Sequence, residues 1–537
     1  MSKTVGQSSS WDVVIVGAGM AGATLGYALA KAGKKVLFCE KGRDPAGDAR
    51  SKLGNYAETF KPRSGVLTPA DREELESAGR YWSELRDFSG KRERKFVPFI
   101  GAGSGGSSAL YGAALERFFP ADFTPARNFQ SGHQSELPDA WPIGFDELLP
   151  YYRQVEALYR VRGGPDALKG EAGPVYDLAG ADLQPDSREL WDFFLGKGLH
   201  PYRLPIACEQ IPGCNGCQGY LCAKGCKNDS ARVCLSVAVA EYGAELWSAC
   251  ELVSLDAGKH RIRRARCIRN GVPVEVEADN FVLAAGALET PALLLRSANE
   301  FWPSGVANGS GLVGKNLMRH YVDIYAVFAK ASRQGGGLKQ LAFNDFYLSK
   351  GRKLGTVQSF GFLPPGDMLV DSLQDDIRNG PLPIAGSALA LVRPLMSGFL
   401  EQLFGRATMM ASIMEDLPYR SNRVFLGSAG EICIDYQIQP FDQERIKVFR
   451  RELAEVFRPY RTLLVKQAEN NQRIAHVCGT CRFGDDPDAS VLDRNNRAHG
   501  IDNLYVVDAS FFPSSGGTNP ALTIAANALR VAERILA

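Results

Sequence analysis

Three glycines near the start of the chain have the spacing of a dinucleotide-binding loop. Gly17, Gly19 and Gly22 follow a continuous apolar run at residues 12–16. In such a loop the first glycine permits a tight turn, the second lets the backbone approach a pyrophosphate, and the third allows close helix–strand packing. Glu40 follows Gly22 by 18 residues, where a carboxylate accepts hydrogen bonds from a ribose. The motif predicts a dinucleotide site and does not by itself separate FAD from NAD.

A second group of reactive side chains is a dense cysteine segment, in which Cys214, Cys217, Cys222 and Cys226 are flanked by two further cysteines. Thiolates spaced this closely hold iron–sulfur clusters, so these four are the candidate metal ligands. Zinc is an alternative, although structural zinc sites usually use two ligand pairs separated by a longer loop. The third alternative is no metal, with free thiols or a local disulfide.

The elements that would position these residues alternate between strands and helices. Residues 12–16, 21–32 and 35–39 predict a βαβ unit, and residues 280–285 predict another buried strand. Residues 320–440 contain strand-like pieces between turn signals, which indicates an antiparallel sheet. The expected fold class is α/β: a Rossmann-like nucleotide-binding domain with a second domain built on an antiparallel sheet.

Other expected elements are helices near 145–160, 187–197 and 442–457, a strand at 504–507 and a long helix from about 519. The Gly/Ser loop that begins at residue 101 is expected to continue as a helix towards residue 117.

Composition excludes several classes of protein. The 537 residues are 45% apolar and 23% charged, which is ordinary for a soluble globular protein. A formal net charge of +2 gives no electrostatic basis for nucleic acid or an anionic membrane as the main partner. We find no secretory signal and no apolar run long enough to span a bilayer, so we expect a cytoplasmic protein whose cysteines are reduced or metal-bound.

Four segments resemble the glucose–methanol–choline (GMC) oxidoreductase family, and the likeness extends from end to end. They are the glycine motif, Gly105-Gly-Ser-Ser-Ala-Leu-Tyr-Gly112, Ala285-Gly-Ala-Leu-Glu-Thr-Pro291 with Val313-Gly-Lys-Asn-Leu317 downstream, and the C-terminal set His476-Val-Cys-Gly-Thr480, Asn503-Leu-Tyr-Val-Val-Asp508 and Thr518-Asn519-Pro520. Tyr111 stands where the family commonly has Asn. The resemblance implies that the dinucleotide is FAD, held noncovalently, because the family's usual flavin-linking histidine is not found in the 101–112 loop.

The resemblance also implies a discontinuous architecture. The FAD-binding domain is expected at 10–120, 208–318 and 465–537, and the substrate-binding domain at 121–207 and 319–464. By the same resemblance, cofactor contacts are expected from the loop after residue 105, from the C-terminal segment around Asp508 and Pro520, and from a strand upstream of the second signature. For Leu252 on that strand, the alternative is an ordinary core leucine. The residues concerned are Gly106, Ser107, Ser108, Tyr111, Gly112, Leu252, Asp508, Ala509 and Pro520.

Alcohol oxidation requires removal of the hydroxyl proton and of a carbon-bound hydride, and a neutral imidazole suits the proton. By resemblance, His476 is the base and Asn519 is the partner that binds the substrate oxygen, at the start of a helix whose dipole favours negative charge on the reduced flavin. His320 is expected to be structural. Glu415 and Asp416 either touch substrate or form a strand-end or arginine-paired feature.

The cysteine segment resembles that of the catalytic subunit of bacterial FAD-dependent glucose dehydrogenases, which carries a three-iron cluster near the flavin. The spacing departs from that pattern, because two residues separate the first two cysteines here and Lys227 follows the last.

The predicted function is FAD-dependent oxidation of a sugar, cyclitol or aminoglycoside-like hydroxyl, with oxygen or another electron acceptor. The alternatives are a hydroxynitrile-type flavin lyase and the catalytic subunit of an iron–sulfur or cytochrome-linked dehydrogenase with an electron-transfer partner. A pyridine-nucleotide disulfide reductase using Cys214 and Cys217 would need a second nucleotide motif, and none is evident.

Overall fold

The computed structural model describes residues 11–45, 47–59, 67–214, 216–331, 338–349, 351–378, 392–470 and 476–537. The N-terminal residues used in looking for a secretory signal lie outside these ranges. Within them, no helix has the length and apolar character needed to cross a membrane. The helices are α1 Met20–Lys31, α2 Pro69–Ser77, α3 Ser107–Leu110, α4 Phe145–Leu158, α5 Pro185–Gly196, α6 Ser236–Tyr242, α7 Gly286–Arg296, α8 Gly366–Arg378, α10 Arg393–Phe404, α11 Pro440–Phe457 and α12 Ala521–Leu536.

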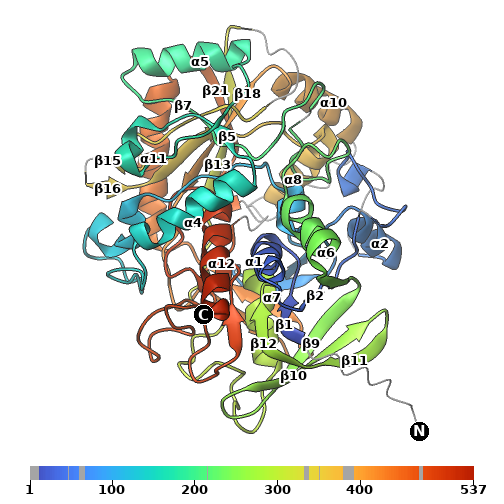
Figure 1. Ribbon diagram of the computed structural model, residues 1–537. Coiled ribbons are helices and arrows are strands. Elements are labelled where there is room, and N and C mark those ends of the chain that lie inside the picture. The colour runs from blue at the N-terminus through green and yellow to red at the C-terminus, as the bar shows by residue number, and fades with distance from the viewer. Residues whose placement is uncertain are drawn as a thin grey trace.

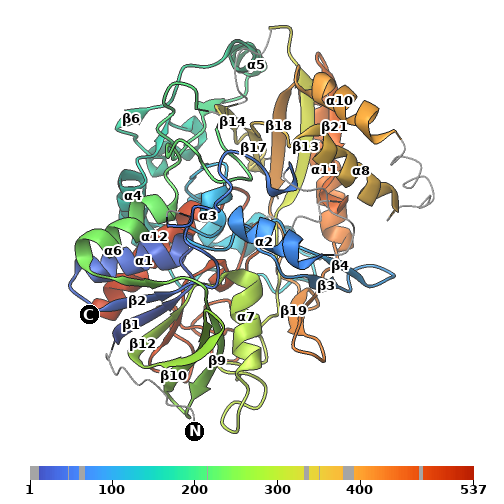
Figure 2. The ribbon, with the colours of Figure 1, turned by 90° about the vertical axis from the view of Figure 1, so that its right-hand side faces the viewer.

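A five-stranded parallel sheet forms the nucleotide-binding half, in the order β22-β12-β1-β2-β8. The strands are β1 Trp11–Val16, β2 Val36–Cys39, β8 Glu245–Trp247, β12 Ala278–Leu283 and β22 Leu504–Val506. α1 and α12 lie on one side of this sheet, and the three-stranded ribbon β9 Cys250–Ala257, β10 Ile262–Arg269 and β11 Val272–Val276 lies on the other (Figures 1 and 2). The Rossmann-like arrangement expected from the sequence is confirmed.

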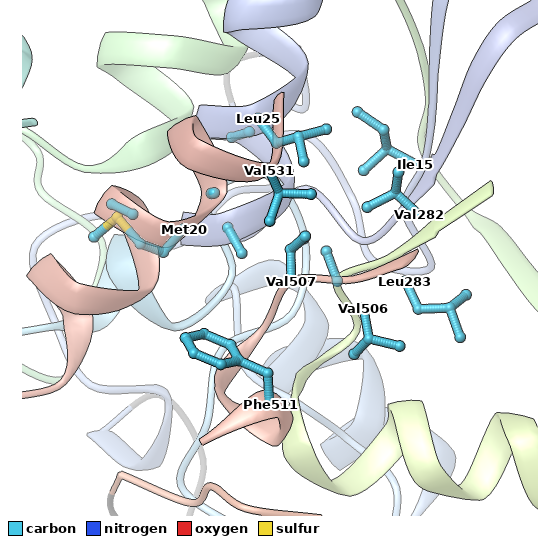
Figure 3. Close-up of a cluster of buried hydrophobic side chains, with 14 of the residues drawn as sticks. Ile15, Met20, Leu25, Val282, Leu283, Val506, Val507, Phe511 and Val531 are labelled. Carbon is cyan, nitrogen blue, oxygen red and sulfur yellow. The ribbon is translucent and has the colours of Figure 1, made fainter. Parts of the chain in front are cut away.

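The core between sheet and helices joins segments from both ends of the chain. Ile15 of β1, Val282 of β12 and Val507, directly after β22, face apolar residues of α1 and α12 such as Leu25 and Val531 (Figure 3). All five side chains are completely buried. Continuous apolar strands of this kind are typical of a parallel sheet that is covered on both faces.

A six-stranded antiparallel sheet forms the other half, in the order β21-β13-β18-β17-β14-β7. Its strands are β7 Tyr202–Arg203, β13 Tyr321–Phe328, β14 Leu341–Phe343, β17 Gly355–Ser359, β18 Thr408–Met414 and β21 Arg461–Lys466. This confirms the antiparallel sheet expected in 320–440, and the upper part of Figure 1 shows it beside α5 and α11. In the other view α8 and α10 lie side by side (Figure 2).

A mixed four-stranded sheet connects the two halves, in the order β19-β20-β3-β4. It pairs β3 Leu85–Asp87 and β4 Arg94–Phe96 with β19 Arg423–Leu426 and β20 Ile432–Asp435. The two-stranded sheets are β5 Arg162–Gly163 with β6 Leu178–Ala179, and β15 Leu348–Ser349 with β16 Arg352–Lys353. The predicted domain boundaries stay a prediction. Strand β21 crosses the boundary that was expected after residue 464.

The helix expected to continue to residue 117 is wrong, because α3 ends at Leu110. Tyr111 is extended, Gly112 follows, and Ala113 has a φ of 58°, a left-handed conformation that a helix cannot contain. The chain therefore leaves the loop as irregular backbone.

The three motif glycines have different neighbours. A methyl group added at Gly17 would lie 2.5 Å from the Ala284 carbonyl oxygen, and one at Gly22 would lie 2.1 Å from the Gly17 carbonyl oxygen. At Gly19 the nearest atom would be the Gly106 Cα at 3.8 Å. The first and third glycines thus allow close packing, whereas the second leaves a bare backbone surface.

This difference predicts unequal effects of adding a methyl group. Gly22→Ala should lower the free energy of unfolding by about 1–3 kcal/mol, because α1 would be forced away from the β1 turn. Gly19→Ala is the matched control and should change it little. Urea unfolding followed by circular dichroism measures both, and equal losses would contradict this account of the packing.

Candidate active site

Glu40, directly after β2, ties three loops together. Its Oε2 accepts a hydrogen bond from the Ala18 N–H at 2.8 Å, and its Oε1 accepts from the N–H groups of Gly42 and Gly103, both at 2.9 Å. The side chain is buried. The carboxylate therefore fixes the position of the glycine loop relative to the loop after residue 101, and the predicted ribose contact stays a prediction.

The 101–112 loop packs directly on the glycine motif. The Gly105 N–H donates to the Ala18 carbonyl at 2.9 Å, and Gly106 has a φ of 49° where a methyl group would lie 3.0 Å from the Gly19 Cα. Ser108 Oγ lies 2.9 Å from Ser230 Oγ. The loop thus approaches the nucleotide motif with backbone rather than side chains.

The remaining predicted residues of this loop have protein partners of their own. The Tyr111 hydroxyl donates to the Asn228 carbonyl at 2.6 Å, and burial raises the pKa of Tyr111 well above its usual value. Ser107 Oγ accepts from the Gly101 N–H at 3.1 Å. Gly112 lies beside Lys339, whose Nζ would be 2.4 Å from a methyl group at this position.

Asp508, just after β22, anchors the beginning of α7. Its carboxylate accepts from the Gly286 N–H at 3.0 Å, from the Thr290 hydroxyl at 2.5 Å and from the N–H of Ser510 at 2.9 Å. Burial raises its pKa. The side chain is thus engaged within the protein, and flavin contacts of Asp508 and Ala509 stay predictions.

Leu252 lies on β9, two residues beyond Cys250, whose N–H donates to the Glu40 carbonyl at 2.9 Å. The leucine side chain is buried in the core. This strand therefore runs beside the nucleotide loops, as an adenine contact through its backbone requires, and that contact stays a prediction.

His476 and His320 meet because their two segments form an antiparallel bridge. Met318 and Cys478 exchange two backbone hydrogen bonds of 3.0 Å, which places residue 320 opposite residue 476. The Nδ1 atoms of the two imidazoles lie 2.8 Å apart, with the rings nearly perpendicular. His476 has a φ of 61°, an uncommon backbone conformation for a side chain of this kind.

Both imidazoles are neutral near pH 7. Burial lowers the pKa of His476 well below its usual value, and the charges of His320 and Lys339 act in the same direction. Burial also lowers the pKa of His320 to about 4. Since unfolding would restore their ordinary pKa values, the stability contributed by these neutral rings is lost as pH falls below about 6.5.

Asn519 ends the loop that precedes α12, and Pro520 caps that helix. Asn519 is buried, and its Oδ1 has no hydrogen-bond partner among the described residues. No acidic residue occurs in the first turn of α12. The unpaired Oδ1 is suited to a ligand that donates a hydrogen bond, while the N-terminus of α12 beside it favours negative charge.

A fully buried cluster of charged side chains contacts the loop at residues 515–519, which precedes α12. Lys353 Nζ contacts the carboxylates of both Asp122 and Glu415. Glu415 Oε1 accepts from the Gly516 N–H at 3.3 Å. The Tyr347 hydroxyl donates to Asp122 and accepts from the Gly517 N–H, both at 2.8 Å. Lys353 could not be identified from the sequence, since no local pattern distinguishes a buried lysine.

Glu415 and Asp416 therefore stabilise the site rather than line it. Asp416 accepts from the hydroxyls of Tyr321 and Tyr436 at 2.7 and 2.6 Å, and from the Arg319 N–H at 2.8 Å. Burial raises the pKa of Asp416 to about 7. Both carboxylates are completely buried among protein groups.

Five sulfur atoms gather beside Gly112. Cys208, Cys214 and Cys226 have their Sγ atoms within 4.8 Å of one another, and Cys222 Sγ lies 3.7 Å from that of Cys226. Cys208 was not among the predicted ligands. An antiparallel backbone bridge between Cys208 and Lys227 places it beside the other cysteines. The pocket at this point, which we call the cysteine pocket, is lined by Gly112, Ala113, Ile206, Cys208, Gln210, Gly216, Cys217, Cys222, Cys226, Lys227, Leu338 and Lys339.

Two of these thiols have thiolate character. The pKa of Cys214 is lowered to about 6, chiefly by its hydrogen bond with Cys208, and that of Cys222 to about 4, chiefly by its hydrogen bond with Cys217. The pKa values of Cys208 and Cys217 are raised correspondingly. Since the thiolate is the form that binds metal, the cluster has the electrostatics of a ligand set.

Other cysteines are packed in the core. Cys234 lies against Tyr159 and Thr24, away from the pocket. Cys478 and Cys481 are buried within the backbone pairing of their segment. A second group of three thiols is formed by Cys39, Cys250 and Cys267. Because these residues come from three separate strands, no spacing in the sequence reveals the group. None of the twelve cysteines forms a disulfide in the described part of the chain.

The structure thus combines a Rossmann-like glycine loop with a partly buried histidine whose pKa lies well below its usual value. Residues 204–322 and 419–528 match the GMC oxidoreductase family, and residues 15–62 match an NAD(P)-binding Rossmann-like domain. The chain belongs to the GMC oxidoreductase family.

Relatives cover nearly the whole chain. Paromamine 6'-oxidase of Streptomyces fradiae is 29% identical, covering 98% of this chain and 91% of the relative. The 2-methyl-1,2-propanediol dehydrogenase of Mycolicibacterium austroafricanum is 26% identical, covering 98% and 95%. The crystal structure of pyridoxine 4-oxidase from Mesorbium loti has the same fold, with a TM-score of 0.62, 22% identity, and coverage of 98% of this chain and 99% of that one.

FAD is the cofactor of this family, and the residues present fit it. The backbone at Gly19 is bare, and the first turn of α1 contains no acidic residue that would oppose a pyrophosphate. Ser104 Oγ and Asn519 Oδ1 are buried polar atoms without a partner in the described part of the chain. These groups would hold the pyrophosphate and the flavin side of the cofactor.

Removing the charge of Lys353 tests whether the buried cluster stabilises the protein. Lys353→Met should lower the free energy of unfolding by about 3–5 kcal/mol, because two buried carboxylates would lose their counterion. Arg458→Met removes an exposed partner of Glu455 and is the control that should change stability little. Urea unfolding of both variants is the measurement, and a wild-type midpoint for Lys353→Met would contradict the paired state of the cluster.

Proposed function

We propose that this enzyme oxidises a hydroxyl group of a sugar, cyclitol or aminoglycoside-like molecule, with FAD as cofactor and His476 as the base. FAD-dependent oxidation of an alcohol follows from its family and relatives. The observation that supports His476 is its electrostatic state: it is only partly buried, yet its pKa is lowered so far that the ring is an unprotonated base at neutral pH.

Each side chain of the site has a distinct task in this proposal. His476 takes the hydroxyl proton, and Asn519 orients the substrate oxygen through its unpaired amide. When bound, FAD would supply the acceptor for the hydride that leaves the substrate carbon. The N-terminus of α12 favours negative charge beside Asn519. Glu415 and Lys353 keep the 515–519 loop in place.

The substrate class rests on the relatives. A protein named paromamine 6'-oxidase covers nearly the whole chain, which supports a polyhydroxylated substrate. Both oxidases and dehydrogenases occur among the relatives, so the electron acceptor is oxygen or another acceptor. A hydroxynitrile-type lyase is excluded if the flavin absorbance bleaches when an alcohol is added anaerobically.

The cysteine pocket supports a second candidate role, an iron–sulfur centre that passes electrons from the flavin to a partner protein. Its sulfur atoms are close enough to share a cluster, and the charge of Lys227 is favourable beside Cys217, Cys222 and Cys208. Gly112 lines the same pocket and belongs to the predicted flavin loop. This arrangement adds Cys208 as a candidate ligand beside Cys214, Cys217, Cys222 and Cys226.

The base is tested by His476→Ala. Loss of a positioned base should slow anaerobic flavin reduction by about 10²–10⁴-fold, while FAD binding persists. Asn519→Ala should slow the same step, and His499→Ala should not, since that imidazole hydrogen-bonds to Ser490 at 2.8 Å and, within the described residues, contacts neither His476 nor Asn519. Because the pKa of His476 lies well below 6.5, the wild-type rate should stay constant from pH 6.5 upward and decline only at lower pH. Stopped-flow reduction at the wild-type rate in His476→Ala would identify another base.

The cluster is tested by metal analysis of anaerobically purified protein. Iron and acid-labile sulfide should co-purify, and Cys226→Ser should remove them because its sulfur contacts those of both Cys214 and Cys222. Cys234→Ser is the control that should retain them. Zinc in place of iron, or neither metal, would end the electron-relay role and leave the flavin chemistry intact.

A further inference from the structure

We propose that His320 is a positioning residue that holds His476 in the tautomer with hydrogen on Nδ1, so that the basic lone pair is on Nε2. The inference rests on the proposed function of His476 and adds to it the atom that acts and the residue that selects it. Its basis is the hydrogen-bond pattern around the two imidazoles.

The tautomer of His320 is set by its surroundings. Its Nε2 lies 2.9 Å from the Gly516 carbonyl oxygen and 3.1 Å from the Ser515 carbonyl oxygen. Carbonyl oxygens only accept hydrogen bonds, so Nε2 must be the atom that carries hydrogen. With a pKa of about 4, His320 is neutral and bears a single ring hydrogen. Its Nδ1 is therefore an acceptor.

The tautomer of His476 follows from that of His320. The two Nδ1 atoms are 2.8 Å apart, a distance that requires one hydrogen between them. Since Nδ1 of His320 has none to donate, Nδ1 of His476 is the donor. The neutral His476 ring then has its lone pair on Nε2, the nitrogen that does not face His320.

Backbone and side-chain contacts keep this arrangement in place. The Met318–Cys478 bridge fixes the two segments in register. His320 is buried, and the carbonyls of Ser515 and Gly516 belong to a loop held by Glu415 and Asp416 through Gly516 N–H and Ser515 Oγ. The carbonyl acceptors therefore cannot easily turn away and allow the opposite tautomer.

The charges around the pair also favour two neutral rings before substrate binds. Lys353 lowers the pKa of His320, whereas Asp122 raises it, and these two groups are paired with each other. Lys339 and His320 lower the pKa of His476. When His476 accepts the substrate proton at Nε2, the new positive charge is stabilised by its Nδ1–H hydrogen bond to His320 Nδ1.

The tautomers can be observed directly by nuclear magnetic resonance of the FAD-loaded enzyme labelled with ¹⁵N-histidine, whose chain has six histidines; His476→Ala and His320→Leu assign the two ring signals. We expect hydrogen on Nδ1 of His476 and on Nε2 of His320 at pH 7. In His320→Leu, His476 should lose this preference. Hydrogen on Nε2 of His476 in the wild type would overturn the inference, whatever the activity measurements give.

Kinetics provide the second measurement. His320→Leu should slow flavin reduction about 10²-fold at saturating substrate, with KM little changed, because the base is misoriented and partly in the wrong tautomer. His320→Asn, which keeps a side-chain acceptor near the Nδ1 position, should recover part of the rate. His499→Leu is the control for loss of an imidazole elsewhere.

The outcomes separate the two levels of the proposal. If His476→Ala is slow and His320→Leu is fast with an unchanged His476 tautomer, the role of His320 is refuted and the base survives. If His476→Ala reduces its flavin at the wild-type rate, the proposed function itself fails. If His320→Leu does not fold, the wild-type ring signals and His320→Asn still decide the matter.

Discussion

The pair of backbone hydrogen bonds between Met318 and Cys478 is the constraint on which the site depends. It joins a segment that leads into the antiparallel sheet to one that returns to the parallel sheet, 160 positions apart in the sequence. A one-residue change of register would point one imidazole to the opposite side of the pairing, because side chains alternate along extended backbone. The contact between His320 and His476 exists only in the observed register.

The nucleotide side of the site is built at the carboxyl ends of the parallel strands. Gly17 follows β1, Glu40 follows β2, Ala284 follows β12, and Asp508 lies just beyond β22. These ends meet at one edge of the sheet, where doubly wound proteins bind nucleotides. The carboxylates of Glu40 and Asp508 each accept hydrogen bonds from separate loops, so the edge is held rigid by charged groups that accept from backbone N–H donors.

The substrate side is held by buried charge instead. Lys353, Asp122 and Glu415 have no access to solvent, and they reach the 515–517 loop through Glu415 and Tyr347. Such a cluster adds little net stability compared with apolar packing, but it penalises every arrangement in which one charge loses its partner. The same loop supplies the carbonyls that accept from His320, so the buried ions are linked to His476 through that loop and His320.

The sequence by itself determined the features that depend on local periodicity and on backbone freedom. The βαβ unit, the glycine roles at Gly17, Gly19 and Gly22, the antiparallel sheet and most helices follow from apolar spacing and from positions where a methyl group cannot fit. The family motifs also named His476 and Asn519 as site residues.

Only the tertiary structure decided which side chains meet. Nothing local in the sequence pairs His320 with His476, adds Cys208 to the cysteine pocket or buries Lys353 between two acids, because each contact joins segments distant in the chain. The helix predicted to continue to 117 failed for a related reason: the left-handed Ala113 that ends it arises from the loop's packing, which periodicity does not encode. Spacing determines the elements, and contacts between distant segments determine the chemistry.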